Sequence, residues 1–151
     1  MNTKSGSMDL RGQPAVHAMQ RASLGEPGRL VWDFLTLFAE RRYAEANAYL
    51  APGCRMLFPG GIGFVDCTEL PKRASGTYRW VKKVFERFDE IETADGVVVY
   101  NFGTLRGEWP DGEPFEGVRY IDRFLVRDGK IADQKVWNDL GIAISARAAC
   151  G

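Results

Sequence analysis

The sequence predicts a single α+β domain in which N-terminal helices pack on one face of a curved antiparallel sheet. Three observations predict it. Apolar residues recur with helical spacing in the first third of the chain, segments rich in β-branched and aromatic residues fill the last third, and an Asp-Gly turn joins two of those segments. The length of 151 residues suits one domain, and a content of 45% hydrophobic and 26% charged residues is ordinary for a globular protein.

The predicted helices come first along the chain. The segment 27–42 begins with Pro27, which suits the first turn of a helix, and Leu30, Phe34 and Phe38 then recur every four residues. We expect this helix to be buried on most of its sides. The pattern further predicts a short helix at 43–50, a strand at 54–58, an irregular loop at 59–66, an interrupted helix at 68–83 and a strand at 84–93.

The last third of the chain predicts a meander of three long antiparallel strands. They occupy 97–109, 115–127 and 130–139, and the last two are joined by the two-residue turn Asp128-Gly129. We expect the folded domain to span 27–142. A polar, flexible arm is predicted before it at 1–26, and a tail after it at 143–151.

One acidic residue, Asp122, lies where the alternation predicts a core position. Side chains alternate between the two faces of a strand, and one face of 115–127 carries Val118, Tyr120, Asp122, Phe124 and Val126. If no bulge intervenes, the tight turn fixes the register so that Asp122 faces Lys135 and Tyr120 faces Trp137. The sequence therefore predicts an acid, a lysine, a tyrosine and a tryptophan together on the apolar face of the sheet.

Two interpretations of this group remain open. Asp122 and Lys135 can form a cross-strand ion pair that only fixes the register of the sheet. Alternatively, the group lines a small-molecule pocket, in which burial raises the pKa of Asp122 and the lysine lowers it. A carboxyl group poised in this way can transfer a proton or donate a hydrogen bond.

Charge and cysteine content exclude several classes of function. Lysine plus arginine and aspartate plus glutamate both number 20, which argues against a nucleic-acid partner or an anionic membrane surface. No apolar run reaches the roughly 18 residues that a membrane span needs. The three cysteines are scattered, so we expect no disulfide framework, no metal site and a reducing cytoplasm. The one histidine, His17, lies in the predicted arm, so that chemistry without a cofactor must rest on carboxylate, lysine and tyrosine.

Three segments carry a resemblance to a known superfamily. "VWDFLTLFAERRYAEANAYLAPG", "VVVYNFGTLRGEW" and above all "IDRFLVRDGKIADQKVW" resemble the nuclear transport factor 2-like proteins, over residues 27–142. That superfamily includes SnoaL-like polyketide cyclases, ketosteroid isomerases, scytalone dehydratases and limonene epoxide hydrolases. The resemblance implies a cone-shaped fold with a strongly bent sheet around the helices, a deep apolar cavity and, often, a homodimer.

The functional positions of the superfamily carry over only in part. Asp122 matches the strand acid of the cyclases and isomerases, and Trp137 matches a cavity aromatic. The isomerase base would fall near Phe58, the isomerase tyrosine near Phe34 and the cyclase histidine near Leu105, and none of these residues has the required group. The Arg-x-Asp pair of the epoxide hydrolases is missing. A steroid isomerase or an epoxide hydrolase of the known kind is therefore not expected.

These observations give one main function and two alternatives. The main prediction is an isomerase, lyase or cyclase without a cofactor or metal, acting on a small hydrophobic or cyclic carbonyl compound. Asp122 and Lys135 would be catalytic, and the ligand would be bound by Tyr120, Trp137, Phe124, Phe34 and Phe58. The alternatives are a binding protein that has the cavity without the chemistry, and a dimerisation domain.

Other conspicuous residues are predicted to lie outside the catalytic site. We expect Asp33 to lie on a solvated helix face and Lys82 and Lys83 to be solvated charges. The glycine-rich "FPGGIG" is predicted to be a rim at the cavity mouth. A row of arginines on the face opposite Asp122 suits a moderately polar dimer interface, and it consists of Arg119, Arg123 and Arg127.

Overall fold

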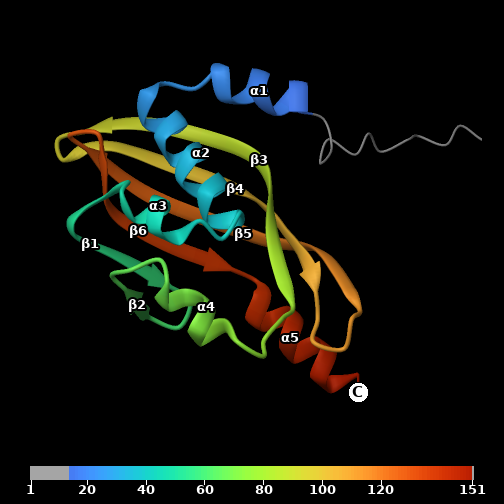
Figure 1. Ribbon diagram of the computed structural model, residues 1–151. Helices are drawn as coiled ribbons and strands as arrows, with labels where there is room; N and C mark the ends of the chain where they lie inside the picture. Colours follow the sequence, from blue (N-terminus) through green and yellow to red (C-terminus); the bar gives the residue numbers. More distant parts are fainter. Residues whose placement is uncertain (1–13, 151) are drawn as a thin grey trace, which may run out of the picture.

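A computed structural model describes residues 14–150 and confirms the predicted α+β class (Figure 1). The helices are α1 (Pro14–Ala22), α2 (Glu26–Ala39), α3 (Tyr43–Asn47), α4 (Glu69–Ala74) and α5 (Leu140–Ala149). The strands are β1 (Leu50–Phe58), β2 (Ile62–Phe64), β3 (Trp80–Thr93), β4 (Gly96–Glu108), β5 (Pro114–Arg127) and β6 (Lys130–Asn138). Among these residues no helix is both long and apolar enough to cross a membrane.

The six strands form one bent sheet in the order β2-β1-β6-β5-β4-β3. All neighbours are antiparallel except β1 and β6, which are parallel. Helices α2 and α3 lie across the inner face of the sheet, while α5 lies at its other end, beside the turn between β4 and β5 (Figure 1). The sheet therefore has a helix-covered inner face and an outer face on which no helix of the described chain packs in this view.

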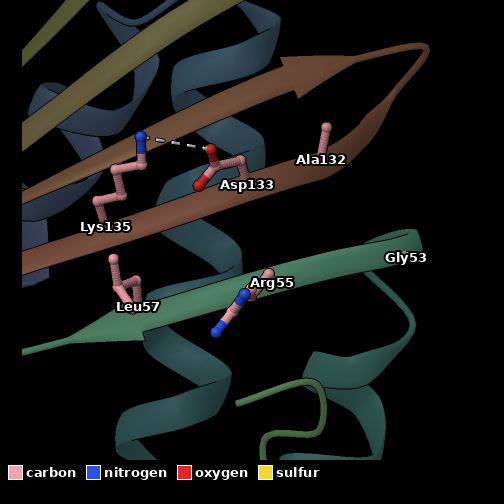
Figure 2. A pocket seen from close by; sticks show the side chains of 6 residues that line it. All are labelled: Gly53, Arg55, Leu57, Ala132, Asp133 and Lys135. Atoms are coloured by element: carbon pink, nitrogen blue, oxygen red, sulfur yellow. Dashed lines mark ion pairs between the residues drawn. The ribbon is translucent and has the colours of Figure 1, made fainter. Parts of the chain in front are cut away.

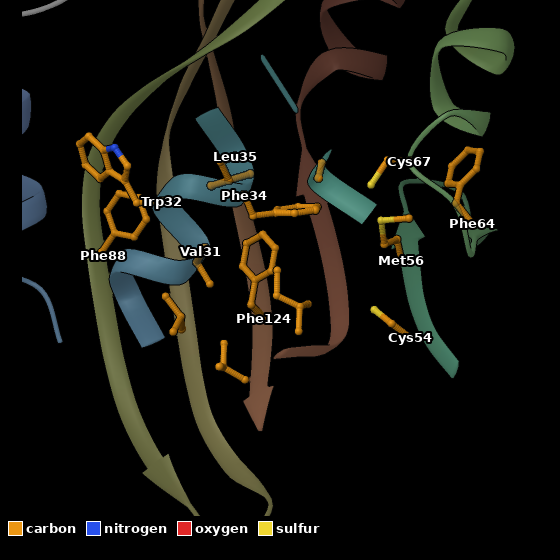
Figure 3. Packing of buried hydrophobic residues seen from close by; sticks show 14 residues of the cluster. Val31, Trp32, Phe34, Leu35, Cys54, Met56, Phe64, Cys67, Phe88 and Phe124 are labelled. Carbon is orange, nitrogen blue, oxygen red and sulfur yellow. The ribbon is translucent and has the colours of Figure 1, made fainter. Parts of the chain in front are cut away.

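Helix α2 is held on the inner face by its apolar side chains and by its first turn. Phe34 is buried and meets Phe124 of β5 edge to face, with ring centroids 5.9 Å apart. Figure 3 shows these rings among the buried residues that the helix and the strands contribute. The carboxylate of Glu90 on β3 accepts hydrogen bonds from the backbone N–H groups of Gly25, at 2.8 Å, and Gly28, at 2.6 Å. Glu90 thus satisfies two of the N–H groups that the start of a helix leaves unpaired.

Both ends of the chain are more regular than predicted. Residues 14–22, assigned to the flexible arm, form α1, and Arg21 of α1 pairs with Asp33 of α2 at 2.7 Å. Residues 1–13 of the predicted arm lie outside the described residues. Most of the predicted tail belongs to α5, where Arg147 pairs with Asp111 and Glu113 in the turn between β4 and β5. The ion pairs of Arg147 connect elements far apart in sequence, which is why local pattern did not reveal them.

Two predicted boundaries are wrong for reasons of strand pairing. The irregular loop at 59–66 contains β2, because the positive-φ residues Gly60 and Gly61 make the turn that brings β2 back along β1. The helix predicted to reach residue 83 gives way to β3 at Trp80, since this segment pairs with the end of β4. Pairing with a neighbouring strand outweighs the local preference in both places.

The predicted register of the last hairpin holds for only two residue pairs. Arg127 faces Lys130 and Val126 faces Ile131, but Leu125 then faces Asp133, so Ala132 is an extra residue in β6. Such a bulge shifts every later pair by one, and a shift of one residue moves side chains to the other face. The prediction that Asp122 faces Lys135 and Tyr120 faces Trp137 is therefore wrong.

Candidate functional site

Asp122 is a buried carboxylate at the centre of the inner face. It lies on β5 between Asn101 of β4 and Val136 of β6, and its residue exposure is 0%. One oxygen, Oδ2, accepts a hydrogen bond from Nζ of Lys83 at 2.5 Å. The other oxygen, Oδ1, has no hydrogen-bond partner among the residues that the structure describes. A buried carboxylate oxygen without a partner is rare in folded proteins and costs free energy.

Lys83 reaches Asp122 from β3, across the whole width of β4. Gly103 of β4 lies opposite both Phe85 of β3 and Tyr120 of β5, and it places no side chain in the path. A Cβ atom at Gly103 would lie 2.0 Å from the backbone oxygen of Val84, so the close approach of the two strands requires glycine here. The bulge of β3 next to this point lets the strands approach so closely.

Tyr120 and Asn101 complete a polar group around the ion pair. The Tyr120 hydroxyl donates a hydrogen bond to Oδ1 of Asn101 at 2.9 Å, and Nδ2 of Asn101 donates to the backbone oxygen of Arg87 at 3.2 Å. Nζ of Lys83 lies 4.0 Å from the centroid of the Tyr120 ring, within the range of a cation–π interaction. These contacts connect Lys83, Asn101, Tyr120 and Asp122, which together with the neighbouring Gln134 form what we call the polar cluster.

Burial governs the protonation of the two acids in the polar cluster. Burial raises the pKa of Asp122, whereas the positive charge and hydrogen bond of Lys83 lower it, as does the Gln134 side chain; burial is the largest effect. Burial and the nearby Asp122 charge also raise the pKa of the Tyr120 hydroxyl. The Tyr120 hydroxyl therefore stays neutral, and burial favours the neutral form of Asp122 more than water would.

The structure separates Lys135 and Trp137 from Asp122. Both lie on the outer face, where Lys135 faces Arg123 and forms a long ion pair of 3.9 Å with Asp133. Lys135 also lines a surface hollow of about 380 Å³ together with Arg55 and Leu57 of β1 (Figure 2). Trp137 is 52% exposed. The prediction that these two residues share a site with Asp122 is wrong, because the bulge at Ala132 turns them outward.

The predicted ligand-binding aromatics have separate environments. Tyr120 lies within the polar cluster, beside Asp122 as predicted. Phe34 and Phe124 are packed in the core beneath α2. Phe58 is half-buried at the end of β1 and meets Phe64 of β2 edge to face, with centroids 5.2 Å apart. Phe34 and Phe124 therefore fill the space under α2, whereas Phe58 packs against β2.

Sequence reasoning missed three members of the polar cluster. Lys83 was predicted to be solvated, although it lies two residues from the apolar Val81 and Phe85 and therefore shares their face of the strand. Asn101 follows Val99 on the inner face of a strand otherwise rich in apolar residues, and its polar side chain was a usable signal. Gln134 became an inner-face residue only through the bulge, for which the sequence carries no clear sign. Its Oε1 has no hydrogen-bond partner in the described part of the chain.

The fold matches known structures, whereas the sequence does not match known families. No protein-family model matches the chain, and no curated protein is similar to it in sequence. An NTF2-like protein of unknown function from Burkholderia pseudomallei superposes with a TM-score of 0.67 at 16% identity, covering 81% of this chain and 97% of that protein. The structure of TerC crystallised with polyporic acid gives a TM-score of 0.66 at 17% identity, with 81% and 97% covered.

A third similar structure is IdmH from Streptomyces antibioticus, for which a polyketide cyclase activity has been suggested. It has a TM-score of 0.63 at 18% identity, and the match covers 83% of this chain and 99% of IdmH. At these identities the likeness establishes the fold. The chain has the nuclear transport factor 2-like fold that the sequence resemblance predicted.

Proposed function

Starting from the nuclear transport factor 2-like fold, we propose that the chain binds a small hydrophobic or cyclic carbonyl compound and that Asp122 transfers a proton on it. The reaction would be of the isomerase, lyase or cyclase type. The observation that carries the proposal is a fully buried carboxylate with a raised pKa, one oxygen held by Lys83 and the other without a partner. The ligand class is supported by TerC, a protein of the same fold that was crystallised with polyporic acid.

Asp122 would act as the base and then as the acid. Its carboxylate takes a proton from the carbon next to the carbonyl, and the electrons of that C–H bond form the C=C bond of an enolate. The carboxylic acid so formed returns the proton to a carbon or an oxygen of the same molecule. A base with a pKa nearer to neutrality performs both steps more efficiently, and burial moves the pKa of Asp122 in that direction.

Lys83 would have the catalytic role that the sequence analysis predicted for Lys135. Its ammonium group, 2.5 Å from Asp122, supplies a fixed positive charge where negative charge develops on the enolate oxygen. Its side chain is 24% exposed, while that of Asp122 is only 1% exposed. Lys83 therefore lies between Asp122 and solvent, and a ligand would reach the carboxylate by displacing the ammonium group toward its own oxygen.

A non-catalytic binding or dimerisation domain is the second candidate. It is favoured by the complete burial of Asp122 and by the lining of the surface hollow beside Lys135, which does not include Asp122. In this case Asp122 and Lys83 form a structural pair. Their charges would then only join β3 to β5 across the intervening strand.

We also infer a homodimer that is formed through the outer face of the sheet. Trp137 is half-exposed there, next to Ile121, and the arginine row predicted for this face lies on it. An exposed tryptophan among apolar and arginine side chains is typical of protein interfaces. Light scattering on the purified protein would give the mass of the dimer.

The buried free cysteines Cys54 and Cys67 fit a reducing compartment such as the cytoplasm.

The first experiment is native mass spectrometry with a panel of cyclic ketones, polyketides and hydroxylated aromatics, followed by assays of turnover. Four variants are compared with the wild type. Asp122→Asn and Lys83→Gln change the proposed site, whereas Asp133→Asn and Lys135→Gln make the same changes on the outer face. We expect turnover to be lost in the first two variants and kept in the other two, while Asp122→Asn still binds the ligand.

The alternative outcomes separate the candidates. Binding without turnover, in the wild type as in all variants, would identify a binding protein. Loss of turnover in Lys135→Gln but not in Lys83→Gln would contradict the roles proposed here. If nothing in the panel binds and Asp122→Asn is merely less stable, the pair is structural and the proposed chemistry is wrong.

A further inference from the structure

A second hollow lies on the surface, away from Asp122. It has a volume of about 420 Å³ and lies between the end of α2 and the paired strands β3 and β4. Its lining consists of Ala39, Glu40, Arg41, Trp80, Lys82 and Arg106. The volume is in the range of small-molecule sites. Lys82 is the neighbour of Lys83 on β3, and because side chains alternate along a strand it points to the opposite face.

The charges of this hollow are not compensated. Lys82 of β3 lies directly opposite Arg106 of β4, an arrangement of like charges that destabilises a sheet. Within the described part of the chain, Lys82, Arg106 and Arg41 form no ion pair. The acid in the lining, Glu40, is already paired with Arg42 at 3.0 Å. Three cations therefore surround one hollow, and an anion placed between them would remove their mutual repulsion.

Trp80 gives the hollow a planar apolar wall. Its Nε1 donates a hydrogen bond to Oε2 of Glu108 at 3.3 Å, and the guanidinium of Arg106 lies 5.8 Å from its ring centroid. Glu108 also accepts a hydrogen bond from Arg79 at 2.8 Å, so its charge is already paired. The tryptophan is thus fixed beside the cations, where it can stack on a flat group attached to the anion.

We propose that this hollow is a binding site for an aromatic carboxylate. The carboxylate would lie between Lys82 and Arg106, since an arginine guanidinium can hold both carboxylate oxygens at once, and Arg41 would close the site from the end of α2. The aromatic ring would lie against Trp80. The site is distinct from that of Asp122, because neither Asp122 nor Lys83 is among the residues that line the hollow.

The test is calorimetric titration of the full-length chain with 2-naphthoate, with its uncharged analogue 2-naphthamide and with inorganic phosphate. We expect 2-naphthoate to bind more tightly than either of the other two. In Lys82→Gln/Arg106→Gln the affinity should fall at least about tenfold, which corresponds to about 1.4 kcal/mol. Lys72→Gln removes one exposed lysine of α4, outside the hollow, and should leave the affinity unchanged. The double variant should melt no lower than the wild type, since it removes two opposed like charges.

Several results would overturn the proposal. Equal affinity for 2-naphthamide would show that the charges do not recognise the ligand, and phosphate binding as tight as that of 2-naphthoate would indicate an adventitious anion only. An equal loss of affinity in Lys72→Gln would show that the net charge of the protein, and not the hollow, determines the affinity for 2-naphthoate. Asp122→Asn should bind 2-naphthoate as the wild type does. If it does not, binding depends on the inner face and this proposal fails.

Discussion

The inner face of the sheet has two halves of opposite character. Beneath α2 the side chains are apolar and interlocked, as with Phe34 and Phe124. Two residues before Phe124 on the same strand and face, Asp122 begins the polar cluster, in which two buried oxygen atoms have no hydrogen-bond partner among the described residues. Strand order and alternation are the same in both halves. The comparison teaches that burial of apolar side chains in one half stabilises the fold enough to offset the free-energy cost of the buried carboxylate in the other half.

The largest effect is expected in the apolar half. Phe124→Ala removes a fully buried ring that contacts Phe34, and it should lower the free energy of unfolding by about 3–5 kcal/mol, as large-to-small changes in a core do. Urea denaturation would measure the loss. Phe124→Leu, which keeps most of the volume, should lose clearly less. Similar losses for both variants would mean that the cavity does not determine the cost.

Next in size is the loss of the ion pair in the polar half. Lys83→Met leaves the buried Asp122 carboxylate without its cation, and we expect a loss of about 3 kcal/mol at neutral pH, at the low end for an uncompensated buried charge because the carboxyl group can protonate. The double variant Lys83→Met/Asp122→Leu should recover most of that loss in the same denaturation assay. A double variant as unstable as the single one would show that the lysine contributes by packing alone.

The pH dependence of stability separates the two halves further. Burial raises the pKa of Asp122 in the folded protein, so the folded state binds more protons than the unfolded state between the unfolded pKa, about 3.9, and the raised folded pKa. The contribution of Asp122 is therefore full below this window and is lost as the pH rises through it. We expect wild-type stability minus Asp122→Asn stability to fall across the window, measured by urea denaturation at a series of pH values. The difference between wild-type and Phe124→Leu stability should not change with pH. If the difference for Asp122→Asn rose with pH instead, the effect of Lys83 on the pKa of Asp122 would be larger than that of burial.

A smaller effect is expected where α2 begins, at the edge of the apolar half. Glu90→Ala removes the acceptor of the Gly25 and Gly28 N–H groups and should cost about 1 kcal/mol, the usual value of a helix cap. Thermal unfolding would detect it. Glu92→Ala, on the same strand, should be nearly neutral. Equal effects of the two substitutions would point to the net charge of β3 as the cause.

The smallest effect is expected outside both halves, at Lys135. Its side chain is 43% exposed and its ion pair with Asp133 is long, so Lys135→Gln should change the free energy of unfolding by less than about 0.5 kcal/mol. The contrast with Lys83→Met in the same assay tests which lysine supports Asp122. A loss at Lys135 as large as that at Lys83 would favour the unbulged register.

The sequence predicted the fold and two residues of the site, Asp122 and Tyr120, for identifiable physical reasons. Alternation along β5 suffices to place Asp122 inward, because it depends on neighbours in the sequence. The partner of Asp122 could not be found in this way. Lys83 comes from a strand that is not adjacent to β5 in the sheet, and it reaches Asp122 only over a glycine on the strand between them. Lys135 was chosen instead because a hairpin register is the one long-range contact that a turn predicts.

The bulge at Ala132 has a consequence for how such proteins diverge. Deleting this one residue would restore simple pairing, and Lys135 and Trp137 would then turn inward while Gln134 and Val136 turned outward. Two chains that differ by a single codon in this hairpin would thus present different chemical groups beside the same aspartate. Alignments of relatives should therefore match residues that point to the same face of the sheet. A gap of one position in this hairpin would align inner-face residues of one chain with outer-face residues of the other.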